Sequence, residues 1–501
     1  MENKAQNLLD VDPFARARAA CEQMIAWASS DGCPDDHAEV ERQIEVRGRE
    51  FQRLVLQGRL DRMFAEEAEQ MRRRPTPGRL RVRERWLETI FGRVKVRRYG
   101  VRRAGQRSSR FRLDRRLRLP REMYSMGLRR RVAEEARSQS WDQAVTRVDT
   151  TTGGHVPKRQ AEQLVERAAQ DFETFYAERR QSEPANDTVD SETLLVLSCD
   201  GKGVAMRAEA LRDATRKQAE EAERDEVRGD PTEVRAERRF CKRMATVTAV
   251  WDQAPCERTA DDIVRKLRRD GERAARALPR PERKRVAASI EKNLAAGIAE
   301  MFDEADRRDP ERERPCVALV DGDEDQVDQI EAQAARRGRA VTIVLDLLHV
   351  LHYVWLAGMA IRRTDAKQTE AWVRRYLYKL LTAAQPLDVI AGIHQAATLA
   401  RLTDEERAPV EKCIGYLRSN VSYIRYPQFL AAGLPIATGV IEGACRHLVQ
   451  DRLGVTGARW GLKSAESVLR LRALATNGDW DAYWRFHLRK ENERSKAARA
   501  A

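Results

Sequence analysis

Three aspartates, Asp200, Asp321 and Asp346, stand where short apolar runs with strand composition come to an end. In open α/β sheets, groups at the carboxyl ends of strands converge on one crevice, so we expect these side chains to lie close together. Converging carboxylates cannot all stay ionised without a cation, and Mg²⁺ and Mn²⁺ prefer carboxylate oxygens. Each aspartate alone is an ordinary turn residue. Together they predict a site for two ions that would clamp the attacking and leaving oxygens of a phosphodiester.

A fourth acid, Glu442, lies in a helical segment whose other residues are mostly small or apolar. Arg446 follows four residues later, so an exposed ion pair is the simpler interpretation. The apolar neighbours Ile441 and Leu448 argue against full exposure, and a carboxylate among such neighbours usually has a cation partner. We therefore include Glu442 in the predicted acidic site.

The segments that must position these acids alternate between strand and helix patterns from residue 193 onward. Apolar runs predict strands at Leu194–Leu197, Met244–Trp251, Cys316–Val320 and Val341–Leu345. Helical periodicity predicts helices at Ala260–Arg268, Ala287–Asp306 and Asp325–Arg336, and an almost wholly helical region over 356–430. Strands that alternate with helices predict an α/β sheet with both faces covered.

The basic charge of the chain is concentrated in one segment. The whole chain has a formal charge of +14, whereas residues 71–160 contain 27 Lys and Arg against 8 Asp and Glu, a net charge of +19. Residues 1–70 are acidic, with 9 Lys and Arg against 15 Asp and Glu, and have helical apolar spacing. A solvated basic face is the simpler interpretation, but so many uncompensated charges would repel one another strongly. We therefore expect this segment to hold the phosphate backbone of a nucleic acid.

The first half of the basic segment alternates as a β-hairpin does. From Arg81 to Arg102, apolar and basic residues take turns on either side of Phe91-Gly92. A structural hairpin and a basic ribbon on DNA both fit this pattern. On the second interpretation the residues in contact with DNA are Arg97, Arg98, Arg102 and Arg103.

Residues 126–180 have the outline of a helix-turn-helix DNA reader. A first helix is predicted over 128–136, a second begins after a Ser140 cap, and a third opens at Pro157 after the breaker Gly153-Gly154. In such a reader the start of the last helix faces the major groove, which would place Lys158, Arg159 and Gln160 there. An ordinary helical bundle fits the pattern almost as well.

Other features of the sequence set limits on cofactors and location. The eight cysteines are scattered with no CxxC spacing, so we expect no zinc site. No stretch is apolar over the roughly 20 residues that a bilayer needs, so we expect no membrane span. The beginning of the chain has no leader pattern, so we expect a cytoplasmic, nucleoid-associated protein.

A set of motifs resembles the bacterial DDE insertion-sequence transposases of the ISKra type. These motifs are SCDGKG around Asp200, KRMATVTAV at 242–250, VDGD at Asp321, LDLLHVLHYVW from Leu345, and TGVIEGACRHLVQDRLGVTGARW ending at Trp460. Upstream, YSMGLRRRVAEEARSQSWDQA and TGGHVPKRQAE are similar to the DNA-binding half of that group. The resemblance spans roughly residues 85–490.

The resemblance implies a ribonuclease-H-like catalytic core with an all-helical insertion before the glutamate helix. It also implies a catalytic and metal-binding triad of Asp200, Asp321 and Glu442 with two Mg²⁺ or Mn²⁺ ions, in which Asp200 would bridge both ions. The second acid is the open position, because Asp323 and Asp346 are alternatives to Asp321. Supporting roles beside the site or on phosphates are expected for Asp346, His349, Lys202, Arg446 and Arg452.

The expected organisation follows from these patterns and the resemblance. The fold is an α/β ribonuclease-H-like core with an all-helical insertion, preceded by a helical and helix-turn-helix-like DNA-binding region. The expected boundaries are an acidic helical region 1–70, a basic β-hairpin region 71–125, a helix-turn-helix-like region 126–180, a linker 181–192, the first part of the core 193–355, the insertion 356–430, the glutamate-helix part of the core 431–490, and a basic tail 491–501.

The predicted function is that of a DNA transposase. It would bind the terminal inverted repeats of an insertion sequence and catalyse metal-dependent strand cleavage and transfer into target DNA. Two ends must be brought together, so a homodimer or larger homo-oligomer on double-stranded DNA is the least assumption. Two alternatives stay open: a non-catalytic DNA-binding relic or repressor, and a structure-selective nuclease of the same fold.

Overall fold

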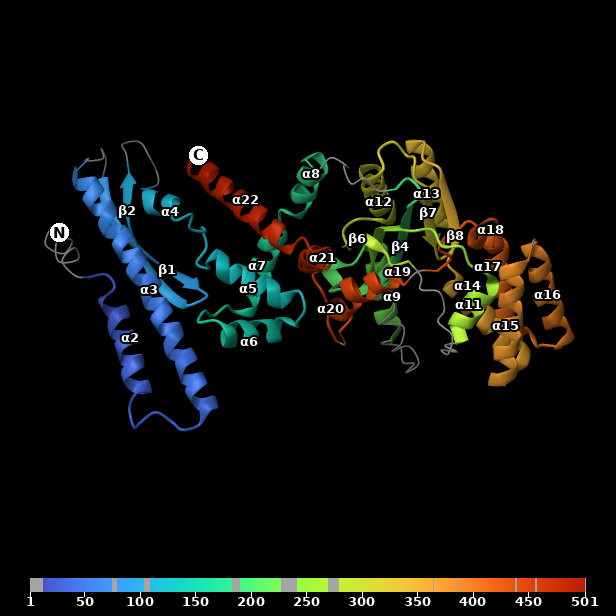
Figure 1. Ribbon diagram of the computed structural model, residues 1–501, viewed down its shortest axis with the longest axis horizontal. Helices are drawn as coiled ribbons and strands as arrows, with labels where there is room; N and C mark the ends of the chain where they lie inside the picture. Colours follow the sequence, from blue (N-terminus) through green and yellow to red (C-terminus); the bar gives the residue numbers. More distant parts are fainter. Residues whose placement is uncertain are drawn as a thin grey trace. The chain divides into compact units, whose positions relative to one another are not determined.

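The structure is a computed structural model, and its chain divides into two compact units (Figure 1). The amino-terminal unit comprises Met1–Phe175 together with Gly478–Ala501, and the sheet unit comprises Tyr176–Asn477. The residues described are 12–73, 79–102, 109–182, 190–226, 241–268, 279–363, 365–383, 385–437, 439–455 and 457–500. Across these ranges, no helix combines the length and the apolar character needed to cross a membrane.

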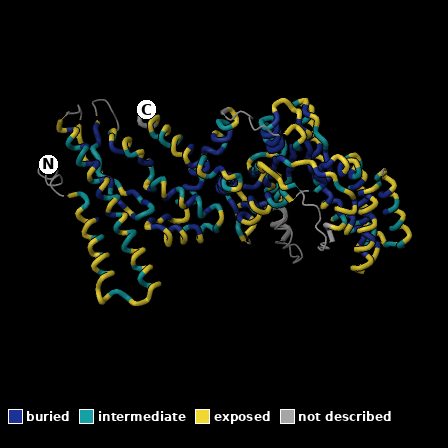
Figure 2. Tube along the Cα trace, viewed as in Figure 1, coloured by how far each residue is buried: buried dark blue, intermediate teal, exposed yellow. Residues whose placement is uncertain are grey.

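The amino-terminal unit begins with two helices and a small antiparallel sheet. The helices are α2 (Ala15–Ala28) and α3 (His37–Arg73), and the strands are β1 (Arg79–Thr89), β2 (Gly92–Arg102) and β3 (Arg110–Phe111), in the order β1-β2-β3. The predicted hairpin is therefore present, with its turn at Ile90-Phe91. The buried side chains Leu60, Met63 and Phe64 of α3 pack with Val94 and Val96 of β2. Helix α2 contributes one buried residue, Ala17, and is otherwise half-buried or exposed (Figure 2).

Three helices follow the short helix α4 (Arg112–Arg116), as the sequence spacing predicts. They are α5 (Met126–Ala136), α6 (Trp141–Thr151) and α7 (Lys158–Ala169). A capping box starts α6, because Ser140 Oγ accepts a hydrogen bond from the Gln143 amide at 3.2 Å and the Gln143 side chain accepts one from the Ser140 amide. Leu128 of α5, Val148 of α6 and Leu164 of α7 are buried where the helices pack together.

The turn between α6 and α7 packs directly on the hairpin turn. The Gly153 amide donates to the Ile90 carbonyl at 2.9 Å. A Cβ on Gly153 would lie 2.4 Å from the Phe91 carbonyl oxygen, and one on Gly154 would lie 2.5 Å from the Thr89 carbonyl oxygen. Only residues without a side chain fit this approach. The hairpin and the three helices are therefore one packed body.

The carboxyl-terminal helix α22 (Trp480–Ala500) belongs to the amino-terminal unit. The ring Nδ1 of the buried His487 donates a hydrogen bond to the Asp171 carboxylate at 2.7 Å, and Arg494 forms an ion pair with the same carboxylate at 2.6 Å. The Tyr483 hydroxyl donates to the Ala168 carbonyl at 2.6 Å. We expected residues 431–490 to complete the core and 491–501 to be a tail. The structure differs because these buried polar contacts hold the last helix against α7 and against Asp171, which precedes α8 (Phe172–Ser182).

The sheet unit contains a mixed five-stranded sheet. Its strands are β4 (Leu194–Ala205), β5 (Lys242–Gln253), β6 (Glu282–Ser289), β7 (Cys316–Val320) and β8 (Val341–Leu345), in the order β6-β5-β4-β7-β8. Strand β5 runs antiparallel to β4 and β6, whereas β4, β7 and β8 are parallel. Four strands lie where the apolar runs predict them. The helix predicted to begin at Ala287 was wrong in its first part. Residues 287–289 are the end of strand β6, whose charged first half gave no apolar strand pattern, and the helix begins only at Leu294.

Helices cover both faces of this sheet. On one face lie α12 (Leu294–Arg308) and α13 (Glu324–Arg337). This is the face that carries the Thr246 side chain of β5, because Gly297 of α12 lies directly against that side chain. On the other face, which carries the Asp200 side chain, lie α19 (Val440–Ala444) and the π-helical turn η4 (Cys445–Gln450). Helix α21 (Leu462–Thr476) ends at the free edge of β6, where the Asn477 side chain accepts from the Val286 amide at 2.9 Å. The expected α/β architecture with two covered faces is therefore present, with a mixed rather than all-parallel sheet. The remaining short elements of this unit are η1 (Ala208–Ala210), α9 (Asp213–Glu226), α11 (Ala260–Arg268) and α20 (Asp451–Leu453).

A block of helices stands between the last strand and the helix of Glu442. It consists of α14 (Leu347–Arg362), α15 (Ala366–Thr382), α16 (Pro386–Leu399), α17 (Asp404–Ser419), η3 (Val421–Tyr423) and α18 (Tyr426–Ala431). Buried Trp372, Tyr376 and Leu417 form part of its core. The all-helical character predicted for 356–430 is thus observed, and the first helix begins directly after Asp346 rather than at 356.

Candidate active site

The three aspartates lie at one level across three neighbouring strands. Parallel pairing aligns Ser198 of β4 with Leu319 of β7, and Val320 of β7 with Leu345 of β8. The same registers, continued along the chain, bring Asp200 beside Asp321 and Asp321 beside Asp346. Asp200 is not at the end of its strand as expected, because β4 continues to Ala205 in its pairing with β5.

Asp321 is partly buried and is fixed by hydrogen bonds to its carboxylate and its backbone amide. Burial raises the pKa of its carboxyl, and the negative charges of Asp200 and Asp323 add to this rise. The amide of Asp323 donates to Asp321 Oδ1 at 3.1 Å, which opposes the rise in pKa. The buried Gln326 side chain accepts from the Asp321 amide at 3.3 Å and donates to the Cys199 carbonyl at 2.7 Å, so it connects the end of β7 to the middle of β4.

The two alternatives for the second acid both cap helices. Asp323 is exposed, and its Oδ1 accepts from the Gln326 amide at 3.0 Å at the start of α13. Asp346 is buried, and its Oδ1 accepts from the Leu348 amide at 2.7 Å at the start of α14. Capping gives each of these carboxylates a structural task. Asp321 caps no helix in the described part of the chain.

Glu442 lies in α19, which is joined to the acidic edge of the sheet at two points. The Leu347 amide donates to the Ile436 carbonyl at 2.8 Å just before this helix. Directly after it, the Cys445 thiol donates to Asp200 Oδ2 at 3.2 Å. The π-helical turn that starts at Cys445 interrupts regular α-helical spacing at this point, a feature frequent at functional sites.

The Glu442 carboxyl is partly buried and incompletely paired. Burial raises its pKa, the charges of Asp346 and Asp200 raise it further, and His349 opposes the rise. Its Oε2 atom is buried and has no hydrogen-bond partner among the described residues. A buried acceptor of this kind costs free energy unless a cation or a proton meets it. His349 acts in the same direction on the pKa of Asp321, so the imidazole lies near both acids.

The helical block contributes residues to the site that sequence reasoning missed. The Tyr416 hydroxyl donates to the Asp321 carbonyl at 2.7 Å, and Tyr353 stacks on the Tyr416 ring at 4.0 Å between centroids. Next to Asp321, Gly322 has φ +89°, and a Cβ there would lie 2.9 Å from both Asn420 and Tyr416. The block therefore holds the turn that carries Asp321.

The basic residues expected near the site have different surroundings. Lys202 is half-buried on β4 and close enough to lower the pKa of the Cys445 thiol, although burial raises that pKa overall. Arg446 is exposed and lies 3.6 Å from Asp451, so the simple Glu442–Arg446 pair is not formed. Arg452 is buried over the Trp460 ring at 4.6 Å, and burial lowers its pKa to about 10. That guanidinium packs inside the sheet unit, so the structure does not present it for a phosphate contact.

The hairpin arginines predicted to contact DNA fall into two groups. Arg97 forms an ion pair with Asp61 at 2.9 Å, and the Arg98 guanidinium is paired with the buried Asp114 and lies over Phe111. Arg102 is exposed. Arg103 lies outside the described residues.

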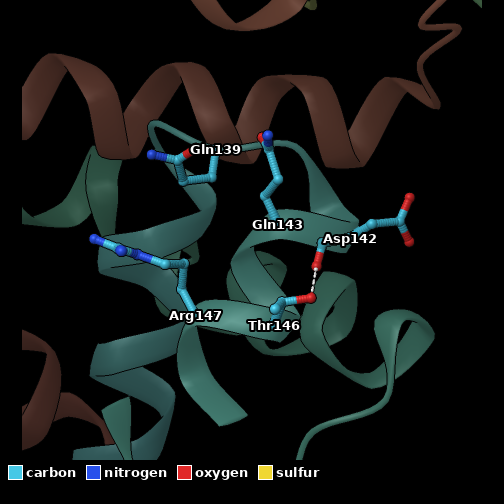
Figure 3. Close-up of a pocket in the computed structure, with 5 residues that line it drawn as sticks. All are labelled: Gln139, Asp142, Gln143, Thr146 and Arg147. Atoms are coloured by element: carbon cyan, nitrogen blue, oxygen red, sulfur yellow. Dashed lines mark hydrogen bonds between the residues drawn. The ribbon is translucent and has the colours of Figure 1, made fainter. Parts of the chain in front are cut away.

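The three residues predicted at the start of α7 lie at its surface. Lys158 donates to Asp142 of α6 at 2.8 Å, Arg159 is exposed, and Gln160 is half-buried. Beside them, α6 and the residue Gln139 that precedes it line a surface hollow, where the Thr146 hydroxyl donates to the Asp142 carbonyl at 2.9 Å (Figure 3). The residues that line this hollow are Gln139, Asp142, Gln143, Thr146 and Arg147. Amide, hydroxyl and guanidinium groups suit hydrogen bonding to a polar ligand.

No protein-family model and no curated protein matches this sequence. Within the described ranges, no three His, Cys, Asp or Glu side chains are grouped closely enough to hold an ion as they stand. The chemistry of the donor set, all carboxylate, and the orphaned Oε2 of Glu442 fit a hard divalent cation. Residues that would hold it are Asp200, Asp321 and Glu442.

Proposed function

We propose that this chain is a metal-dependent DNA transposase with a ribonuclease-H-like core. The observation that carries the proposal is the convergence of Asp200, Asp321 and Glu442 from β4, the end of β7 and α19 on one edge of the sheet. The sheet order β6-β5-β4-β7-β8, with β5 antiparallel to the other strands, supports this type of core. The motif resemblance to ISKra-type transposases points the same way.

The acids of the site have the electrostatic character that metal-assisted phosphoryl transfer needs. Burial raises the pKa of Asp321 and Glu442, and repulsion by the nearby Asp200 adds to the rise in both, so their ionised forms are costly without a cation. When bound, two Mg²⁺ or Mn²⁺ ions would lower the pKa of a water nucleophile and neutralise charge that develops on the phosphate. Tyr416 and Gln326 would keep Asp321 in place, and His349 would lie beside both acids as a hydrogen-bonding or proton-accepting group.

The amino-terminal unit would supply DNA binding. Its net charge over 71–160 is +19, and its hairpin and three-helix group form one packed body. A helix-turn-helix reader is supported by the order α5, α6, turn, α7 and by the exposed Arg159 at the start of α7. Terminal inverted repeats and target DNA would be the substrates, on a homodimer or larger assembly.

Strand cleavage tests this proposal. End-labelled duplexes that carry the DNA flanking the gene are incubated with the full chain and Mg²⁺, Mn²⁺ or EDTA, beside a shuffled duplex and a branched duplex of equal length. Metal-dependent nicks at the element ends support the transposase. Equal cutting of branched DNA without regard to end sequence would replace it by a structure-selective nuclease, and binding without cleavage under every condition would replace it by a DNA-binding relic or repressor.

A further inference from the structure

The register of the hairpin places like charges opposite each other at its open end. Arg79 of β1 pairs with Arg102 of β2, and Arg83 pairs with Arg98, while Arg81 lies between them on the same face. Like charges directly opposite each other in an antiparallel pair are destabilising. The fold therefore maintains an unfavourable arrangement on this face.

The inner and outer arginines of this face differ in how their charge is balanced. Arg98 is paired with the buried Asp114, and Arg85, the next arginine toward the turn, donates to the Pro120 carbonyl at 2.9 Å. By contrast, Arg79, Arg81, Arg83 and Arg102 are exposed, and none of them contacts an acid in the part of the chain that the structure describes. We refer to these last four residues as the arginine face.

The opposite face of the hairpin is already neutralised. Lys95 lies 3.2 Å from Glu84, and Arg93 lies 3.3 Å from Glu88. Both cations also lie over the Trp86 ring, at 5.0 and 4.7 Å from its centroid. The cations on this face are paired with acids of the same face, so they do not need an external anion. The arginine face has no such acids among the described residues, so its charges are left for an external anion.

The spacing of the arginine face indicates the kind of anion. Alternate residues of a strand are about 6.7 Å apart, so Arg79, Arg81 and Arg83 form a regular row of charges. Phosphates along one strand of a duplex form a comparable row, and a two-stranded ribbon fits the major groove. Charged residues on an edge strand also discourage aggregation, but that function does not require four charges of one sign without a counter-ion.

We infer that the arginine face binds the phosphate backbone of duplex DNA, without reading its sequence. This assigns the hairpin contact to Arg79, Arg81, Arg83 and Arg102, and not to the internally paired Arg97 and Arg98 expected from the sequence. The inference rests on the proposed function for the identity of the polyanion. It leaves recognition of specific bases to other parts of the amino-terminal unit.

The test measures DNA binding by fluorescence anisotropy at several salt concentrations in EDTA, so that cleavage plays no part. The full chain is compared with the triple variant Arg79→Gln, Arg81→Gln, Arg83→Gln on an inverted-repeat duplex and on a shuffled duplex. Loss of three phosphate contacts should reduce the slope of log affinity against log salt by about 2 to 3, with at least about tenfold weaker binding at 0.1 M salt. Both duplexes should lose affinity equally.

Two matched variants separate this contact from general effects of charge and folding. Arg18→Gln, Arg42→Gln, Arg62→Gln makes the same change in net charge at exposed, ion-paired positions on α2 and α3, and should keep the slope. The triple variant Arg79→Lys, Arg81→Lys, Arg83→Lys keeps the charge of the hairpin, so it should also keep the salt slope. An unchanged slope in the glutamine variant at the hairpin, an equal change in the control, or tighter binding of duplex RNA than of DNA would overturn the inference. DNA binding through this face by a protein that never cleaves DNA would contradict the transposase proposal alone.

Discussion

The Cys445 thiol donates a hydrogen bond to Oδ2 of Asp200 at 3.2 Å, and so joins the end of the Glu442 helix to the central strand of the sheet. The two residues are 245 positions apart in the chain. This contact occupies one oxygen of a carboxylate that would have to turn to a metal ion in the active protein. A thiol is a weak donor, so under the proposed function a cation would compete with Cys445 for this oxygen.

We predict that Cys445→Ala lowers the Mg²⁺ concentration needed for half-maximal cleavage, because Asp200 Oδ2 no longer accepts from the thiol. A hydrogen bond worth about 1 kcal/mol corresponds to a shift of a few-fold. The measurement is a metal titration of strand cleavage. Cys413→Ala, which removes another buried thiol, serves as the control and should not move the titration. A need for more metal in the Cys445 variant would show that the thiol supports the site.

Replacing a buried carboxylate of the site by its neutral amide should stabilise the metal-free protein. Burial raises the pKa of Asp321 and Glu442 above their unfolded values, so their contribution favours the folded state most at low pH and turns against it as pH rises through the folded pKa. Asp321→Asn and Glu442→Gln should therefore raise Tm in EDTA at pH 7, with a smaller gain at pH 4. Lower Tm at pH 7 in both variants would contradict the electrostatic description of the site.

The helical block should affect cleavage through Tyr416. Tyr416→Phe removes the donor to the Asp321 carbonyl, so we expect about a 10-fold loss of cleavage rate, the scale found for groups that orient metal ligands. Stability should fall by about 1 kcal/mol. DNA affinity should not change. Tyr378→Phe, on the exposed face of α15, is the matched control and should leave all three quantities as in the wild type.

The last helix should be required for the stability of the amino-terminal unit at moderate pH. Burial alone would raise the pKa of Asp171, but hydrogen bonds from Arg494 and His487 hold this pKa at about 2. Because this folded pKa lies below the unfolded value, the stabilisation is present above about pH 4 and is lost as pH falls toward 2. Asp171→Asn should cost about 2–3 kcal/mol at pH 7, measured by denaturant unfolding of the full chain. A loss that is the same at pH 7 and pH 3 would contradict this account.

The sequence predicts those parts of the fold that depend on local patterns. Apolar runs located four of the five strands, and the Ser140 cap and the Gly153-Gly154 turn located α6 and α7, because neighbouring residues determine these features. The strand β6 was missed because its first residues, Glu282 to Arg285, are all charged. Sequence periodicity cannot distinguish such an edge strand from a polar segment.

The candidate site was predictable only where strand topology alone places its residues. Asp321 and Asp346 follow from the rule that parallel strands present their carboxyl ends together. The same rule located Asp200, although β4 continues to Ala205 beyond it. Gln326, Tyr416 and Cys445 act through contacts with residues about 95 to 245 positions away, so no local pattern marks them. The same limit applies to Arg97 and Arg98, whose acidic partners on α3 and α4 cannot be recognised before the hairpin is placed.

The most direct test of the central claim is a comparison of four acid variants in the strand-cleavage assay with Mg²⁺ on an element-end duplex. Asp200→Asn, Asp321→Asn and Glu442→Gln should each lower cleavage by about a hundredfold or more while DNA binding is kept. Asp323→Asn, which alters an exposed helix cap next to the site, should retain most of the activity. Cleavage that survives in the first three variants, or that depends on Asp323 and not on Asp321, would contradict the account.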